Sequence, residues 1–327
     1  MRICIYGAGA IGGYLGAMFV EAGHEVSLVA RGEHLKALRA NGLTLEIGGR
    51  TLKSWPAASA DPAELGPQDY VVVSVKAPAL PPAVRAIGPL LGAQTAVITA
   101  LNGIPWWFFH GFGGPYDGRT LSSVDPEGVL NRSLDMRRVI GCVVHAGCSV
   151  PQPGVIRHAS GDLFIIGEPA SGVSPRCQAL QQVIVGAGLR CDISPRIQQA
   201  VWMKLLGNAS MGPLSVLTSG TLAGMARDPG TRKISAEMIA EAIAVGRHFG
   251  LDPGMTVEER IELGAKLGEF KTSMLQDFEK GRPMELDTFL AAIIEMAQLA
   301  GVSTPTIETV QALTLHKARQ AGLYPPL

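Results

Sequence analysis

Apolar and polar positions alternate in two different ways along the chain, and the change divides it. From residue 1 to about residue 194, short apolar runs alternate with segments of helical periodicity, and the clearest runs are Ile3–Tyr6, Val26–Val29, Tyr70–Val75 and Thr95–Thr99. The run at Tyr70–Val75 is almost continuously β-branched, as expected of a strand buried on both faces. The pattern predicts an α/β domain with a mostly parallel sheet that helices cover on both sides.

Two features depart from this alternation. Leu43–Ile47 and Thr51–Lys53 flank the pair Gly48–Gly49, which predicts a hairpin inserted after the second strand. Later apolar segments predict an antiparallel edge of the sheet, interrupted by a turn rich in proline. These segments are Arg138–Gly147, Val155–His158 and Leu163–Ile166, and the turn is Pro151–Gly154.

Long helical periods replace strands after residue 194. Ile197–Ala209 and Thr231–Phe249 each carry an apolar stripe at helical spacing, and Thr256–Glu259 has the pattern of a capping box. We therefore predict an α/β domain over residues 1–194 and an all-α domain over residues 195–327.

Composition excludes several classes of function. Lys plus Arg number 28, as do Asp plus Glu, so no basic excess draws the chain to nucleic acid or an anionic membrane. The five cysteines and seven histidines show no metal-ligand spacing, so we predict no metal and cysteines buried in a reducing compartment. No apolar run approaches the ~18 residues of a membrane span, and Met1–Val20 lacks the features of a signal peptide. We expect a cytoplasmic protein.

A glycine-rich turn follows the first predicted strand. Gly7, Gly9 and Gly12 fit the G-x-G-x-x-G spacing of dinucleotide-binding turns, and the apolar residues after them have helical spacing. In such a turn one glycine makes the bend, the second lets a pyrophosphate approach, and the third lets helix and strand pack. Ala10 and Ile11 begin the predicted helix and belong to the same cofactor site. The first domain is therefore predicted to be Rossmann-like.

Arg31 ends the second predicted strand, where NAD enzymes usually place a carboxylate for the ribose 2′-hydroxyl. A guanidinium can instead pair with a 2′-phosphate, so we predict a preference for NADP(H). Glu33 is the rival, because NAD is tolerated if this carboxylate turns inward. The structural alternative for Arg31 is a solvated charge.

Lys76 and Asn102 each follow a predicted strand, at the edge where open α/β sheets bind ligands. We expect both to lie near the nicotinamide half of the cofactor. The alternatives are a surface lysine and an Asn-Gly turn.

Reduction of a carbonyl requires an acid or cation beside its oxygen. Lys204 and Asn208 are four residues apart on a predicted helix, off its apolar stripe, and together they can protonate and orient a keto oxygen. A solvated lysine with an unrelated asparagine is the alternative. Glu285 beside Lys204 would raise the pKa of the ammonium. Pro283 is predicted to open a last long helix that Gly301 ends, so Glu285 is also explained by the helix dipole.

With these residues assembled, the sequence resembles the ketopantoate reductase (2-dehydropantoate 2-reductase) family. Motifs in family order run through almost the whole chain. They are Gly7–Gly12, Val75–Ala77, Asn102–Pro105, Trp202–Asn208, and Ser273–Asp277 followed by Gly281–Pro283 and Glu285–Asp287.

The resemblance implies a Rossmann domain joined to an all-helical domain, with the active site in the cleft between them. It implies that NADPH reduces a small 2-keto acid to a 2-hydroxy acid. By matching motif, Lys204 is the catalytic lysine and Glu285 its partner glutamate, while Asn102, Asn208 and Ser273 contact substrate or cofactor.

Two positions and one stretch depart from the family pattern. Gly212 stands where a second asparagine is common, and Phe270 stands where a polar residue can hold the substrate. After Glu285–Asp287, where Asn-Gly often follows, the chain has Thr288–Ala292. A lost hydrogen bond to a buried polar group costs ~1–3 kcal/mol, so the substrate is either ketopantoate or a more apolar keto acid.

Two other functions compete with the reductase. A dehydrogenase of the hydroxyisobutyrate type shares the two-domain plan and a helix-borne lysine, but it does not need the Ser273–Asp277 motif. A non-catalytic NADPH sensor gains little from Lys204 and Glu285.

Two structural questions stay open at the level of sequence. The Gly111–Glu127 stretch is predicted to be a long loop, either a lid or an insertion. Met225, Met255 and Leu263 suit a homodimer interface as well as a core.

Overall fold

The computed structural model describes residues 1–326, which form two compact units. The first unit comprises residues 1–101, 109–119 and 128–197, and the second comprises residues 102–108, 120–127 and 198–326. The sequence boundary after residue 194 lies close to the last of these divisions. The two short segments of the second unit, which come from the long connection after the strand ending at Ala100, were not foreseen.

Within residues 1–326, ten strands of the first unit form one sheet, in the order β4-β3-β9-β8-β7-β6-β1-β2-β5 with β10 beside β9. The strands are β1 Arg2–Tyr6, β2 Glu25–Val29, β3 Leu43–Ile47, β4 Arg50–Ser54, β5 Ala57–Ser59, β6 Gln68–Val73, β7 Leu91–Ala100, β8 Val139–Gln152, β9 Val155–Gly167 and β10 Arg190–Ile193. All neighbours pair in parallel except β3 with β4 and β8 with β9, which are antiparallel. The mostly parallel sheet and the β3–β4 hairpin confirm the sequence prediction.

The long antiparallel pair β8–β9 is interior, so its prediction as an edge of the sheet was wrong. β9 pairs in parallel with β3, through Thr44 opposite Val155 and Glu46 opposite Arg157, while β8 pairs in parallel with β7. The inserted hairpin supplies the additional strands and makes β4 the edge. Sequence periodicity identified the hairpin, but it carries no information about which strand the hairpin joins.

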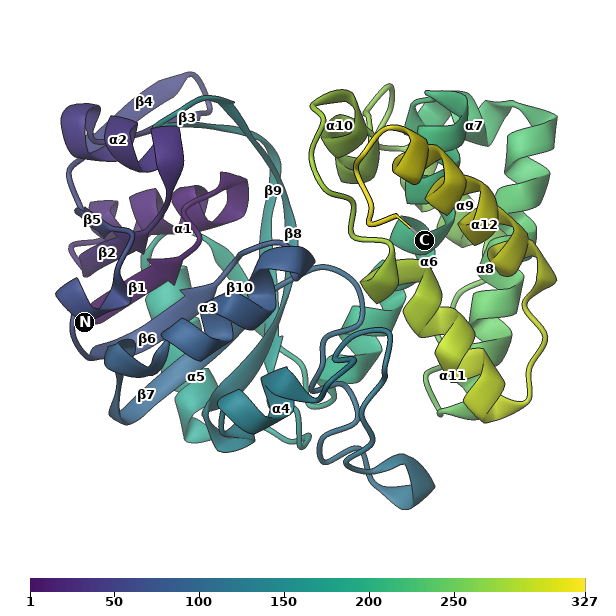
Figure 1. The fold of residues 1–327 in the computed structure, drawn as a ribbon, viewed down its shortest axis with the longest axis horizontal. Coiled ribbons are helices and arrows are strands. Elements are labelled where there is room, and N and C mark those ends of the chain that lie inside the picture. The colour runs from purple at the N-terminus through teal and green to yellow at the C-terminus, as the bar shows by residue number, and fades with distance from the viewer. Residues whose placement is uncertain (327) are drawn as a thin grey trace. The chain divides into compact units, whose positions relative to one another are not determined.

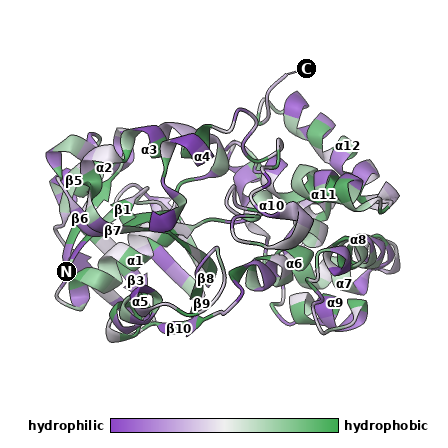
Figure 2. Cartoon of the chain, turned by 90° about the horizontal axis from the view of Figure 1, so that it is seen from below, coloured by the Kyte–Doolittle hydropathy of each residue, from purple (hydrophilic) through white to green (hydrophobic). Residues whose placement is uncertain are grey.

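Helices cover both faces of this sheet (Figure 2). They are α1 Ala10–Glu21, α2 Gly32–Asn41, α3 Leu80–Ala86, α4 Val129–Ser133 and α5 Pro175–Gly186. Figure 2 shows α3 and α4 on one side of the strands and α1 and α5 on the other. Ile3, Ile5 and Leu28 of the sheet share a buried cluster with Leu15 of α1 and Leu180 of α5. This packing fixes the start of α1 at the end of β1.

The second unit is helical (Figure 1). Its helices are α6 Ile197–Thr218, α7 Leu222–Arg227, α8 Pro229–His248, α9 Val257–Ala265, α10 Ser273–Glu279, α11 Ala292–Ala300 and α12 Pro305–Gln320. In α6 only Thr218 is exposed to solvent, so this helix is the centre of the unit. The predicted capping box is present at the start of α9, where Thr256 and Glu259 each bond the other's backbone amide.

The segment after Pro283 is not the start of a long helix, so that prediction was wrong. Residues 282–286 are irregular, Asp287–Ala291 form a π-helical turn, and α11 begins after them. Here the amide of Met284 donates to the carbonyl of Leu323 rather than within a helix. Gly301 ends α11 in the left-handed conformation with φ +65°, as predicted.

Candidate active site

The glycine turn at the carboxyl end of β1 has three different glycine environments. Gly7 has φ +104°, and a Cβ there would lie 2.7 Å from Cγ1 of Val75. A Cβ on Gly12 would overlap the carbonyl of Gly7 and the hydroxyl of Ser74, whereas a Cβ on Gly9 would meet nothing within 4 Å. Gly9 therefore leaves open space in front of the first amides of α1. This is the arrangement that a pyrophosphate requires, with Ala10 and Ile11 in the first turn of the helix.

Two side chains that the sequence analysis missed hold this turn. Ser74 Oγ donates to the carbonyl of Gly7 at 2.9 Å. The imidazole of His34 bonds the carbonyl of Ala8 through Nε2 at 2.7 Å, and its Nδ1 accepts from the amide of Gly154 at 3.1 Å. These two bonds require the neutral imidazole, and burial lowers the pKa of His34, which favours that form. Nothing in the spacing of these residues indicates the contacts, because Gly154 is far away in sequence.

Arg31 lies exposed just beyond the carboxyl end of β2, at the N-cap of α2. Burial raises the pKa of the Tyr6 hydroxyl on β1, and the neighbouring charge of Arg31 opposes this, which places the guanidinium beside the end of β1. Its rival Glu33 is three-quarters exposed and pairs with Lys36 at 2.7 Å. Glu33 is thus engaged with Lys36, and the positive charge at this strand end belongs to Arg31.

Lys76 is half-buried and follows β6 by three residues, because the strand ends at Val73 rather than at Val75. It precedes the short 3-10 helix Ala77–Ala79.

The second unit brings Lys204 and Asn102 together. Lys204 Nζ of α6 donates to Oδ1 of Asn102 at 2.7 Å, and both side chains are half-buried. The amide oxygen holds one of the three ammonium hydrogens and leaves the charge of the lysine in place. The sequence analysis expected Asn102 at the cofactor and Lys204 beside Glu285, and it did not foresee this bond.

Thr288 fixes the backbone around Asn102. The amide of Ile104 donates to the carbonyl of Thr288 at 2.7 Å. Gly103 has φ +78°, and a Cβ there would lie 2.7 Å or less from Thr288, so glycine is required at this position by conformation and by space. The Thr288 hydroxyl is buried and has no hydrogen-bond partner within the described residues.

The other predicted site residues of the second unit lie on separate elements. Asn208 is half-buried on α6, one turn after Lys204. Ser273 is exposed at the first position of α10, whose N-cap Thr272 bonds Ser215 of α6 at 2.5 Å. Glu285 is half-buried in the irregular segment before the π-helix, so stabilising the first turn of a helix does not explain it. Its pairing with Lys204 stays a prediction.

Gly212, one of the departures from the family pattern, faces a methionine. A Cβ at Gly212 would lie 3.5–3.7 Å from atoms of Met274 on α10, which is ordinary van der Waals contact. An asparagine here has to share its space with this thioether. The place of the missing amide is therefore lined by an apolar side chain.

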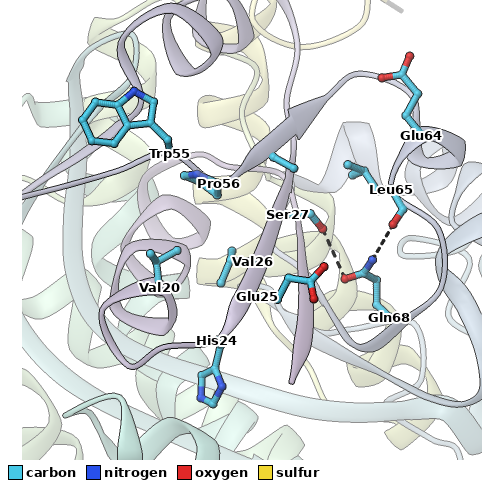
Figure 3. Close-up of a pocket in the computed structure, with 11 residues that line it drawn as sticks. Val20, His24, Glu25, Val26, Ser27, Trp55, Pro56, Glu64, Leu65 and Gln68 are labelled. Atoms are coloured by element: carbon cyan, nitrogen blue, oxygen red, sulfur yellow. Dashed lines mark hydrogen bonds between the residues drawn. The ribbon is translucent and has the colours of Figure 1, made fainter.

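The first unit also has a groove of about 500 Å³, lined by residues that include Glu25, Trp55 and Gln68 (Figure 3). Glu25 and Gln68 are the first residues of β2 and β6, so the groove lies at the amino ends of these strands. Open α/β sheets bind ligands at the carboxyl ends. The groove is therefore separate from the glycine turn.

Residues 1–326 contain no cluster of three or more His, Cys, Asp or Glu side chains that could hold a metal ion. Across the same residues, no helix has the length and apolar character needed to span a membrane. Four of the five cysteines are buried, and Cys148 is half-buried.

Comparison with known proteins identifies the family. Residues 3–171 match the ketopantoate reductase PanE/ApbA model, and residues 196–318 match the ketopantoate reductase PanE/ApbA C-terminal model. The chain belongs to the ketopantoate reductase family. A 2-dehydropantoate 2-reductase of Mesorhizobium japonicum is 46% identical over 99% of this chain and 100% of that protein.

Solved structures agree with this assignment. A crystal structure of a ketopantoate reductase homologue from Ralstonia solanacearum MolK2 is 43% identical, with a TM-score of 0.94 and 99% of each chain covered. A PanE/ApbA family ketopantoate reductase from Ralstonia eutropha JMP134 is 27% identical, with a TM-score of 0.84, covering 98% of this chain and 100% of that one.

Family membership confirms the resemblance, the fold class and the type of enzyme expected from the sequence. The chain is an NADP-dependent oxidoreductase that reduces a 2-keto acid to a 2-hydroxy acid. The hydroxyisobutyrate-type dehydrogenase and the non-catalytic sensor are therefore disfavoured.

Proposed function

We propose that the first unit binds NADPH and that Lys204 of the second unit protonates the keto oxygen of the substrate. The observation that carries this proposal is the hydrogen bond between Lys204 and Asn102, because it aims an ammonium from a half-buried helix face. When bound, NADPH supplies the hydride. The open space at Gly9 suits its pyrophosphate, and the exposed charge of Arg31 suits its 2′-phosphate.

Each residue of the second unit has a distinct part in the proposal. Lys204 holds the proton that the developing alkoxide takes up, and its charge stabilises that oxygen beforehand. Asn102 orients the ammonium. The carboxylate of Glu285, placed beside Lys204, raises the pKa of the ammonium and keeps it charged, and after the transfer the neutral amine takes its proton back from solvent water. Asn208 and Ser273 hydrogen-bond the substrate. Lys76 contacts the nicotinamide half of the cofactor.

The substrate is proposed to be 2-dehydropantoate or a keto acid with a more apolar side chain. The 46% identical relative, which is named 2-dehydropantoate 2-reductase, supports the first. Gly212 supports the second, since it removes a hydrogen-bonding arm at a place where the apolar side chain of Met274 lies.

A panel of 2-keto acids tests both the reductase activity and the identity of the substrate. Loss of NADPH absorbance is followed with 2-dehydropantoate, 2-oxo-3-methylbutanoate and 2-oxo-4-methylpentanoate. We expect turnover of at least one, and the ranking of kcat/KM identifies the side chain. No turnover of any of them alongside tight NADPH binding rejects the reductase.

The Lys204→Ala variant tests the catalytic assignment. It should lower kcat by roughly 10² to 10⁴, the range for a positioned acid, and leave NADPH binding nearly intact. Lys233→Ala is the control, because Lys233 is an exposed lysine of α8. Near-normal kcat in Lys204→Ala removes the lysine from the chemistry.

A cytoplasmic location and a homodimer are also proposed. The buried cysteines fit a reducing compartment. Of the apolar residues considered for an interface, Met225 is buried in the second unit, whereas Leu263 is half exposed and suits a partner surface. Sedimentation of the wild type and of Leu263→Asp tests the dimer, and a monomeric wild type rejects it.

A further inference from the structure

Helix α9 carries a cation that its own carboxylates do not neutralise. Glu258 and Glu262 of this helix both pair with Arg232 of α8. Glu259 is engaged in the capping box at the start of the helix. Arg260 is thus left without a carboxylate partner among residues 1–326.

Arg260 is only partly accessible to solvent, and its Nε is fully covered and has no hydrogen-bond acceptor in the part of the chain that the structure describes. Burial lowers the pKa of this guanidinium, and no nearby carboxylate compensates. A desolvated charge without a partner is costly. A carboxylate ligand would compensate this charge, because the planar fork of arginine matches the two oxygens of a carboxylate.

The guanidinium lies against Gly207 of α6. A Cβ at Gly207 would overlap Nη2 and Cζ of Arg260 and lie 2.9 Å from Nη1. Glycine inside a helix costs ~1 kcal/mol relative to alanine, so its presence here needs a reason. Any larger residue displaces the guanidinium.

Gly207 lies about one helical turn along α6 from Lys204, the residue proposed to protonate the substrate. It is three residues after Lys204 and next to Asn208, and positions three and four apart lie on one side of a helix. The rise over three residues is about 4.5 Å, which is within the length of a small keto acid. The guanidinium and the catalytic ammonium therefore serve the same side of α6.

We propose that Arg260, seated on Gly207, binds a carboxylate of the 2-keto acid whose keto oxygen lies at Lys204. The inference rests on the proposed function. It adds to that function the residue that holds a carboxylate of the substrate, from which a neutral ketone or aldehyde gains nothing. The carboxylate is either the one next to the keto group or a distal one on a dicarboxylic substrate, and the two give different results below.

The test compares Arg260→Gln with the wild type. For the best 2-keto acid of the panel we expect KM to rise about ten- to a hundredfold, as for a lost hydrogen bond to a charged group, with a smaller change in kcat. For the methyl ester of the same acid, KM should differ little between Arg260→Gln and the wild type, because the ester has no carboxylate. 2-Oxoglutarate, a dicarboxylic keto acid, is assayed beside the panel. If the increase in KM is confined to 2-oxoglutarate, the carboxylate bound by Arg260 is the distal one. Arg247→Gln, an exposed arginine on α8, is the control.

A second variant and a second readout keep the test independent of folding and of turnover. Gly207→Ala keeps Arg260 in the sequence, but its new methyl group occupies the space on α6 where the guanidinium lies. This variant should raise KM by a similar factor. Calorimetric titration of the wild-type enzyme and both variants with oxamate, an unreactive carboxylate, should show the same ranking in Kd.

The outcomes separate the two proposals. A wild type that turns over no keto acid rejects the proposed function. Wild-type turnover with an unchanged KM and unchanged oxamate Kd in a folded Arg260→Gln rejects only the role of Arg260. If Arg260→Gln does not fold, unchanged values in Gly207→Ala reject it.

Discussion

The bond between Lys204 and Asn102 gives a quantitative prediction for catalysis. Asn102→Ala deletes an acceptor 2.7 Å from the ammonium. A hydrogen bond to a charged group contributes ~1.5–3 kcal/mol, and the lower end applies because both side chains are half-buried. If the bond orients the lysine in the transition state, kcat/KM for the keto acid should fall by roughly 10-fold.

A double-mutant cycle shows whether this loss passes through the lysine. Once Lys204→Ala has removed the ammonium, adding Asn102→Ala should lower kcat/KM almost no further. The two substitutions then have a coupling energy of ~1–2 kcal/mol. NADPH absorbance gives kcat/KM for the four proteins, and cofactor titration checks that KM for NADPH is similar in all of them. Asn41→Ala, an exposed asparagine that ends α2, is the control.

Multiplicative losses would refute the reasoning. A coupling below ~0.5 kcal/mol means that Asn102 acts on the cofactor or substrate independently of Lys204.

The first unit gives further predictions. Arg31→Ala should raise KM for NADPH far more than for NADH, and equal effects exclude a 2′-phosphate contact. Gly12→Ala should destabilise the protein by roughly 1–3 kcal/mol in urea unfolding, because its methyl overlaps the Gly7 carbonyl; an unchanged midpoint contradicts the packing. The pKa of His34 is lowered by burial, so its contribution to stability is complete above the unfolded value of 6.5 and is lost as the pH falls below it. Melting temperatures of the wild type should therefore drop more between pH 8 and pH 5 than those of His34→Gln, and parallel curves would contradict the stabilising role of the His34 hydrogen bonds.

Sequence pattern located most of the elements because the periodicities of buried strands and amphipathic helices are local. The sequence predicted the β3–β4 hairpin, the capping box of α9 and the C-cap at Gly301. The wrong predictions concern long-range choices. The partner of β9 and the backbone after Pro283 depend on segments distant in sequence.

The site shows the same division. The three glycines of the turn and the face of α6 that carries Lys204 follow from spacing alone. The contact of Lys204 with Asn102 joins residues from different parts of the chain, and so do the contacts of His34 and Arg260. Such contacts are set by tertiary packing, and no local signal announces them.

The way the chain threads its two units constrains how the enzyme is made. Residues 102–108 and 120–127 belong to the second unit, although most of that unit is synthesised after residue 197. Asn102 therefore emerges from the ribosome long before Lys204 exists, and its segment, with the buried Trp106 and Trp107, has to wait for the remainder of its core. A fragment that begins at residue 198 lacks both tryptophans and Asn102, so cutting the gene at the apparent boundary does not yield a complete helical half.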